Sequence, residues 1–118
     1  MVESDFVRWS QRIKEFCSER DWDQFHGPKD LAIGLVTEAS ELLEEFRFWT
    51  ETQIEEGLKT KEKREAIGDE LADVLFFVLR FSQRYQFDLN QCLERKMKKN
   101  AERYPALEFK GKNHKSTR

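Results

Sequence analysis

Residues 71 to 79, LADVLFFVL, constrain the fold more than any other part of this 118-residue chain. Eight of these nine residues are apolar, and Asp73 is the exception. A helix built from this segment carries hydrophobic side chains on most of its sides, so it has to lie at the centre of a packed structure. The run is also far shorter than the roughly 20 apolar residues that a membrane span needs. The sequence therefore predicts a central helix in a protein without a membrane-spanning segment.

Apolar residues recur with helical spacing along the chain, and no segment alternates with the period of two that is typical of a strand. Ser4 is the expected N-cap of the first helix, and Pro28 suits the first turn of the second. Asp88 is the expected N-cap of the last helix, which Pro105 ends. The stretch from Thr50 to Thr60 is expected to interrupt the helical pattern. The expected helices cover residues 6 to 17, 28 to 46, 62 to 85 and 88 to 104.

Four helices with short connections predict an all-α, four-helix bundle within one domain, residues 1 to 105. Residues 106 to 118 are polar and basic and are expected to form a flexible tail. Three modest helices can hardly cover the apolar central helix, and the chain also contains 10 phenylalanines. We therefore expect a second, identical chain to complete the core, in a homo-oligomer.

The overall charge and the cysteines narrow the class of protein. The formal net charge is −2, so the chain has no global positive field that would attract nucleic acid. Cys17 and Cys92 form no CxxC motif, which fits buried thiols in a reducing compartment. The first residues contain no basic segment followed by an apolar one, so no secretory signal is expected. These features together predict a cytoplasmic location.

Four pairs of acidic residues lie three positions apart, about as many as chance placement of 23 acids in 118 positions produces. The spacing alone therefore indicates no more than helix faces in contact with solvent. Asp73 is different because it lies within the apolar run, where an unpaired carboxylate is expensive to bury. We expect it to be protonated, paired with a cation or bound to a metal ion.

Helix geometry, at about 100° per residue, sorts the acids into two stripes. The stripes contain Glu70, Asp73 and Phe77 on one helix, and Glu38, Glu41, Glu45 and Phe48 on another. If the stripes face each other, their carboxylates repel one another unless divalent cations lie between them. Oxygen ligands favour Mg²⁺ or Mn²⁺ over zinc or copper. Solvated charged faces remain the alternative, whereas a di-iron site is excluded because neither histidine follows a glutamate by three residues.

Two segments in order resemble the ExxE…ExxD signature of the all-α nucleoside triphosphate pyrophosphohydrolases, the MazG-like family. These are EASELLEEFRFW, residues 38 to 49, and DELADVLFFVLRF, residues 69 to 81. Two further segments are similar to the dCTP pyrophosphatase branch of that family, namely RDWDQFHGPKDLAIGLVTEASEL, residues 20 to 42, and KMKKNAERYP, residues 96 to 105. The resemblance covers roughly residues 5 to 105.

The resemblance implies a role for each matching residue. The implied Mg²⁺ ligands are Glu38, Glu41, Glu70 and Asp73. The implied nucleotide contacts are Trp22, Asp23, Gln24, Phe25, His26, Phe48, Phe77, Lys96 and Asn100. Phe48 stands where the relatives often have tryptophan against the base. Phe77 stands at a position that is tyrosine in the mammalian enzymes, so any hydrogen bond from that hydroxyl is absent here. Apart from the resemblance, a loop tryptophan such as Trp22 is more often a plug over the core, and Lys96 and Asn100 would lie on an exposed cationic helix face.

The resemblance further implies Mg²⁺-dependent hydrolysis of a nucleoside triphosphate at its α-phosphorus, which yields the monophosphate and pyrophosphate. Glu41 is our candidate proton acceptor, with Glu38 and Glu45 as alternatives. The expected substrate is dCTP-like, the expected role is removal of surplus nucleotides, and the expected assembly is a dimer or a dimer-of-dimers tetramer.

Two other functions stay open. A non-catalytic helical oligomerisation or regulatory module would have a similar pattern of acidic helices around an apolar core. A dUTP-type hydrolase on the same fold is the alternative within enzymes.

Overall fold

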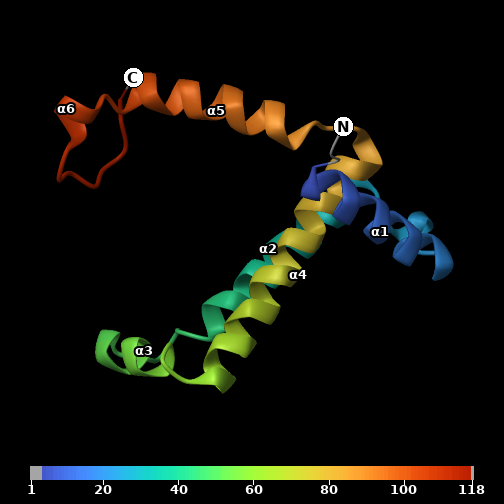
Figure 1. The fold of residues 1–118 in the computed structure, drawn as a ribbon, viewed down its shortest axis with the longest axis horizontal. Helices are drawn as coiled ribbons and strands as arrows, with labels where there is room; N and C mark the ends of the chain where they lie inside the picture. The colour runs from blue at the N-terminus through green and yellow to red at the C-terminus, as the bar shows by residue number, and fades with distance from the viewer. Residues whose placement is uncertain (1–3, 118) are drawn as a thin grey trace. The chain divides into compact units, whose positions relative to one another are not determined.

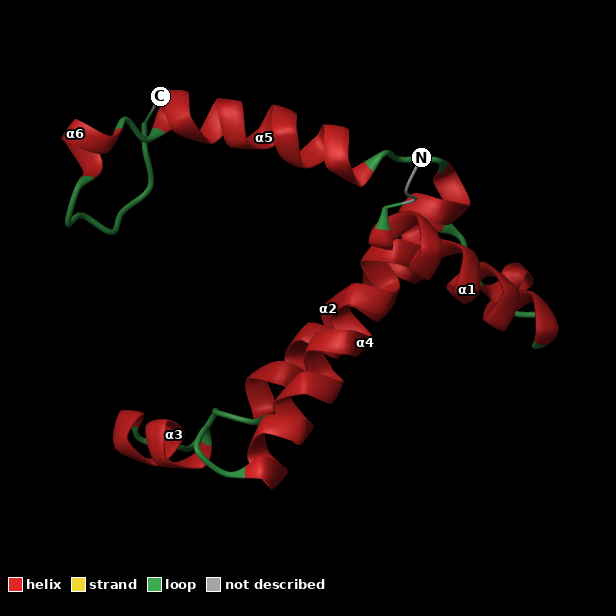
Figure 2. Cartoon of the chain, in the orientation of Figure 1, coloured by secondary structure: helices red, strands yellow, loops and turns green. Residues whose placement is uncertain are grey.

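A computed structural model describes residues 4–117, and each regular element in that range is a helix. In chain order the elements are α1 (Asp5–Glu19), the short 3₁₀ helix η1 (Asp23–Phe25), α2 (Pro28–Glu44), α3 (Glu51–Gly57), α4 (Lys61–Tyr85), α5 (Leu89–Arg103) and α6 (Ala106–Phe109). The all-α prediction is confirmed (Figure 2). Among the described residues, no helix is both long and apolar enough to cross a membrane.

The helix starts follow from local hydrogen bonds that the sequence predicts. The Ser4 hydroxyl accepts a hydrogen bond from the amide of Val7 at 3.2 Å, which caps α1. At α2, Pro28 occupies the first turn and needs no amide donor there. α2 ends at Glu44, two residues short of the expected end, so Phe46 lies outside the helix. α4 matches its expected bounds to within one residue.

α3 was not expected, because we interpreted residues 50 to 60 as an interruption. Thr50 and Gln53 form a reciprocal capping box there. The Thr50 amide donates to the Gln53 side chain at 2.8 Å, and the Gln53 amide donates to the Thr50 hydroxyl at 3.2 Å. This T-x-x-Q pattern is present in the sequence, and it starts a helix of only seven residues.

The chain divides into two compact units, one ending at Gln86 and the other beginning at Phe87. In the first unit, α4 packs against both α2 and α1, so the apolar run lies on the central helix as expected (Figure 1). α2 and α4 run antiparallel. Lys63, at the start of α4, binds Glu45 just after α2, whereas Arg84, near the end of α4, binds the carbonyl oxygen of His26 just before α2.

The core of a single chain is small. Among the described residues, the buried apolar side chains are Ile13, Cys17, Leu31, Ile67 and Leu79. Large apolar side chains are instead exposed on α1, α2 and α4 of the same unit. They include Val7, Trp9, Phe16, Ile33, Val36, Leu43, Leu71 and Leu75. An exposed apolar surface of this extent is typical of a chain that packs against a partner.

The second unit contains α5 and α6. Asp88 caps α5 by accepting a hydrogen bond from the amide of Gln91 at 3.1 Å, as the sequence predicts. Beyond α5, the ring of Phe109 packs against two other rings. The distance between ring centres is 4.9 Å to Tyr104 and 5.3 Å to His114. The division of the chain into a domain and a flexible tail at residue 105 stays a prediction, and Arg118 of that tail lies outside the described residues.

A close approach between α2 and α4 yields a testable prediction. A methyl group at Gly34 would overlap the ring of Phe77, whereas a methyl group at Gly68 would meet no atom within 4 Å. Gly34→Ala is therefore expected to destabilise the protein by about 1–3 kcal/mol, because the ring has to move. Gly68→Ala, the matched control, is expected to stabilise it by up to about 1 kcal/mol through helix propensity. Denaturant unfolding of both variants checks this, and equal effects would contradict the packing described.

Candidate functional site

Four carboxylates from two helices converge where α2 packs against α4. Glu38 and Glu41 lie one turn apart on α2, and Glu70 and Asp73 lie one turn apart on α4. One oxygen atom from each residue can be chosen so that all four lie within 4.8 Å of one another. The two acidic stripes therefore face each other, which the helix spacing alone left open. We call these four residues the carboxylate cluster.

Burial within the carboxylate cluster is uneven. Glu38 and Glu70 are half-buried, and the Oε2 atom of each is buried without a hydrogen-bond partner among the described residues. Glu41 and Asp73 are exposed in the single chain, although the sequence singled out Asp73 as the costly carboxylate. Buried oxygen atoms that lack a donor fit the coordination shell of a cation. Four carboxylates without a nitrogen or sulfur ligand suit a hard divalent ion.

The carboxylates raise one another's proton affinity. The pKa of Glu38 is raised to about 7, first because Glu41 shares a hydrogen bond with its protonated form, and then because of burial and the nearby negative charges. The pKa of Glu70 is also raised, mainly by burial and then by the charges of Glu41 and Asp73. In the absence of a cation, the carboxylate cluster therefore favours holding a proton.

Glu45 lies beyond the carboxylate cluster and has a partner of its own. Lys63 donates to a Glu45 carboxylate oxygen at 2.7 Å and to the Glu45 carbonyl oxygen at 2.5 Å. The same ammonium group lies 3.9 Å from the centre of a Trp49 ring. Glu45 is therefore neutralised by an ion pair, and it is the least available of the three candidate proton acceptors.

The loop between α1 and α2 contains the predicted nucleotide contacts from Trp22 to His26. Trp22 packs edge-on against Phe16 at 5.6 Å and against His26 at 6.2 Å. Phe25 is 61% exposed, and Gln24 donates to the carboxylate of Asp21 at 3.0 Å. The Trp22 side chain is thus neither a buried plug nor fully free.

Asp23 and His26 are held by two arginines that the sequence did not single out. Arg80 binds the side chains of both residues, and Arg84 binds their carbonyl oxygens. The sequence contains a signal for the role of Arg80. An arginine that directly follows the apolar run is expected to be buried, and a buried arginine needs a partner.

The two candidate base-stacking residues have different surroundings. The Phe77 ring lies against Gly34 and meets Phe76 edge-on at 5.4 Å. Phe48 lies after the end of α2 and is 83% exposed, with the guanidinium group of Arg47 at 4.8 Å over its ring. Phe77 is thus half-buried between α2 and α4, one turn from Asp73, whereas Phe48 is exposed to a ligand.

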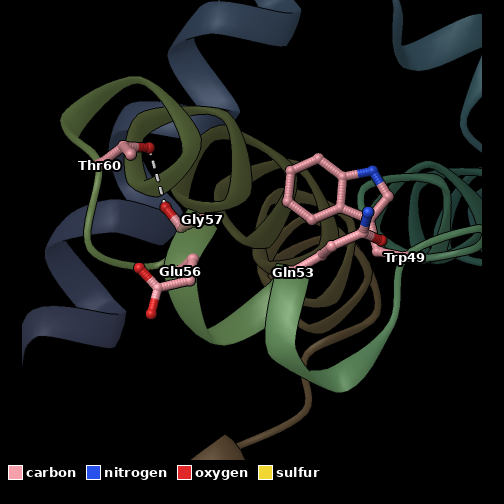
Figure 3. A pocket seen from close by; sticks show the side chains of 5 residues that line it. All are labelled: Trp49, Gln53, Glu56, Gly57 and Thr60. Carbon is pink, nitrogen blue, oxygen red and sulfur yellow. Dashed lines mark hydrogen bonds between the residues drawn. The ribbon is translucent and has the colours of Figure 1, made fainter.

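Two of the hollows in the first unit have the same volume. One has a volume of about 450 Å³ and is mostly apolar. Its lining consists of Trp9, Ile13, Ala72, Asp73, Leu75, Phe76 and Leu79. The other, also about 450 Å³, lies between Trp49 and α3 and is shown in Figure 3, where Thr60 donates to the carbonyl oxygen of Gly57. Only the first hollow shares a residue, Asp73, with the carboxylate cluster.

Lys96 and Asn100 lie in the second unit, one turn apart on α5. Lys96 is exposed and Asn100 is half-buried. Their approach to a substrate at the carboxylate cluster stays a prediction.

The raised pKa of Glu38 predicts how stability varies with pH in the presence of a chelator. A folded-state pKa of about 7, above the ordinary value of 4.5, means that the folded state binds more protons between these values. The stabilisation is therefore complete below pH 4.5 and is lost as the pH rises through 7. We expect the unfolding temperature to fall over this range, and Mg²⁺ to raise it again above pH 7.

Glu38→Gln is expected to flatten this pH dependence, because the amide does not titrate. Glu62→Gln, on the exposed first turn of α4, is the matched control and should leave the dependence unchanged. An equal pH dependence in wild type and Glu38→Gln would contradict the assignment.

Comparison with known proteins gives a consistent result. The MazG-like family matches residues 33–117 of the chain. The chain is 40% identical to mouse dCTP pyrophosphatase 1 over 91 residues, which are 77% of this chain and 54% of the mouse protein. It is 39% identical to human dCTP pyrophosphatase 1 over 92 residues, which are 78% of this chain and 54% of the human protein. The chain thus spans about half the length of the curated relatives it matches.

A solved structure agrees in fold. A pyrophosphatase from Archaeoglobus fulgidus DSM 4304 superimposes with a TM-score of 0.78 and 30% sequence identity, over 89% of this chain and 96% of that one. The family match covers most of the chain and includes all four residues of the carboxylate cluster. The chain belongs to the MazG-like family.

Proposed function

We propose that this chain hydrolyses (deoxy)nucleoside triphosphates to the monophosphate and pyrophosphate, with Mg²⁺ bound at the carboxylate cluster and Mn²⁺ as a substitute. The observation that carries the proposal is the pair of buried, unpartnered oxygen atoms on Glu38 and Glu70, within a set of four converging carboxylates. When bound, a divalent ion screens the phosphate oxygens and lowers the pKa of water. The relatives with pyrophosphatase names support this reaction class.

Glu41 is the proposed proton acceptor. It is exposed, so water reaches it, and it lies within the carboxylate cluster beside Glu38. Glu38 is half-buried and holds a proton readily, and Glu45 is paired with Lys63. A carboxylate that water can reach, and that no cationic side chain pairs with, is the better base.

Aromatic side chains are proposed to bind the nucleoside. Trp22, Phe25 and Phe48 present exposed ring surface, which suits stacking on a flat base. The apolar hollow that adjoins Asp73 offers space of the size that small ligands occupy. A dCTP-like substrate is the best-supported choice, since the mouse and human relatives carry that substrate in their names. Lys96 and Asn100 are the proposed phosphate contacts.

A second copy of the chain is proposed to cover the exposed apolar side chains of α1, α2 and α4. A dimer or a dimer-of-dimers tetramer would bury them, and the small core of the single chain supports such an assembly. Removal of surplus or non-standard nucleotides in the cytoplasm is the proposed role.

Glu41→Gln tests the proposed reaction. We expect kcat for Mg²⁺-dependent pyrophosphate release to fall at least about 100-fold, because the proton acceptor is lost. The matched control is Glu44→Gln, one turn further along α2, where the exposed Glu44 pairs with Arg47 at 3.1 Å. The control is expected to keep its activity, and light scattering is expected to give the same assembly for all three proteins.

The substrate panel for the wild type should include dCTP, dUTP, the other standard triphosphates and 5-modified deoxycytidine triphosphates. A preference for dUTP would favour the dUTP-type alternative. If none of the panel released pyrophosphate with Mg²⁺, the chain would be a non-catalytic module and the proposal would be wrong.

A further inference from the structure

Arg80, near the end of α4, is a fully buried arginine that is 1% exposed. Three of its nitrogen atoms donate to three different side chains. Nε donates to Nδ1 of His26 at 2.9 Å, Nη1 donates to Gln83 at 2.7 Å, and Nη2 donates to the carboxylate of Asp23. Burial of an arginine is costly unless it is paired and hydrogen-bonded, and here residues more than fifty positions earlier supply two of the three partners.

The next turn of α4 binds the backbone of the same loop. Arg84 donates from Nε to the carbonyl oxygen of His26 at 3.0 Å, and from Nη2 to that of Asp23 at 3.1 Å. The Tyr85 hydroxyl also donates to the carbonyl oxygen of His26, at 3.2 Å. The loop itself contains only the three-residue η1. The conformation of the loop therefore depends on α4. Arg80 is the residue of α4 that donates hydrogen bonds to the side chains of the loop.

The Arg80 contact also fixes the hydrogen on the His26 ring. A guanidinium group can only donate, so Nδ1 of His26 has to be the acceptor. The ring is then neutral, and its hydrogen is on Nε2, which can only donate. The surroundings agree, because burial first, and then the charges of Arg80 and Arg84, lower the pKa of His26 against the opposite effects of Asp23 and Asp30.

We propose that Arg80 is a positioning residue that holds the loop from Asp23 to His26 and keeps His26 as a neutral Nε2–H donor for an acceptor oxygen of the nucleotide. This inference rests on the proposed function, in which that loop contacts the substrate. Such an oxygen is present on a pyrimidine ring, on the sugar and on the phosphates. A fixed donor selects for an acceptor at one place, since a ligand without it leaves the donor unpaired.

The first test needs no variant. In the full chain without substrate, ¹⁵N NMR of the histidine rings is expected to show Nδ1 of His26 without a hydrogen and Nε2 with one at neutral pH. A His26 ring with its hydrogen on Nδ1, or a charged ring at pH 7, would overturn the proposal. This result does not depend on whether the chain hydrolyses any nucleotide.

The second test compares Arg80→Lys with Arg84→Lys. A compact ammonium group keeps the charge but cannot reach all the acceptors of the planar guanidinium group. In Arg80→Lys we expect His26 to titrate at a higher pH than in the wild type and the KM for the triphosphate to rise about tenfold, with kcat changed less than about twofold. Arg84→Lys loses hydrogen bonds to backbone oxygens and keeps a positive charge near Asp23, to which Arg84 forms a longer ion pair at 3.8 Å. Arg84 makes no hydrogen bond to the His26 ring, so the His26 titration in this variant should match the wild type.

A double-mutant cycle separates positioning from general stabilisation. If Arg80 acts through His26, adding Arg80→Lys to His26→Gln should raise the KM less than about twofold further. Equal losses of stability and activity in both lysine variants, with unchanged His26 signals, would make Arg80 a structural residue only and overturn the proposal. A wild type that hydrolyses no triphosphate would instead refute the proposed function, and the NMR result would still judge the Arg80–His26 contact.

Discussion

Mutual repulsion among the four carboxylates between α2 and α4 is the constraint on which the rest of the structure depends. Repulsion of this kind is tolerated only if the two helices are held in register by other contacts. At one end, Lys63 binds Glu45. Further along, the Phe77 ring fits against Gly34, where a larger residue would collide with it. These contacts fix the helices on both sides of the carboxylate cluster. Because its carboxylates are held close together, the cluster favours binding of a cation.

The single helix α4 carries two sites of opposite charge. Its middle presents Glu70 and Asp73, which suit a divalent ion, and its last turns present Arg80 and Arg84, which organise the loop ahead of α2. A nucleoside triphosphate has a charged end that needs cations and a nucleoside end that needs shaped, hydrogen-bonding surroundings. The proposed function assigns the two ends of the substrate to two parts of one rigid helix, and a helix fixes the distance between them better than a pair of mobile loops.

Much of this arrangement could be predicted from the sequence because it depends on local spacing. The caps at Ser4 and Asp88 follow from side chains that accept hydrogen bonds at helix starts, and the acidic stripes follow from helix geometry. The distribution of burial could not be predicted, since it depends on which side of each helix meets the other. The sequence pointed to Asp73, yet Glu38 and Glu70 hold the unpartnered oxygens. The contacts of Arg80 could not be predicted, because its partners in the loop lie far away in the chain.

The central claim is that the carboxylate cluster is a divalent-cation site. Anomalous scattering from crystals of the whole chain grown with Mn²⁺ tests it most directly. Mn²⁺ replaces Mg²⁺ at oxygen ligands, and manganese gives peaks in an anomalous difference map. The account predicts one or more peaks within bonding distance of oxygen atoms from both helices, including Oε2 of Glu38 and Oε2 of Glu70. Density without a peak there, with these carboxylates turned apart or bound to side-chain donors, would contradict it.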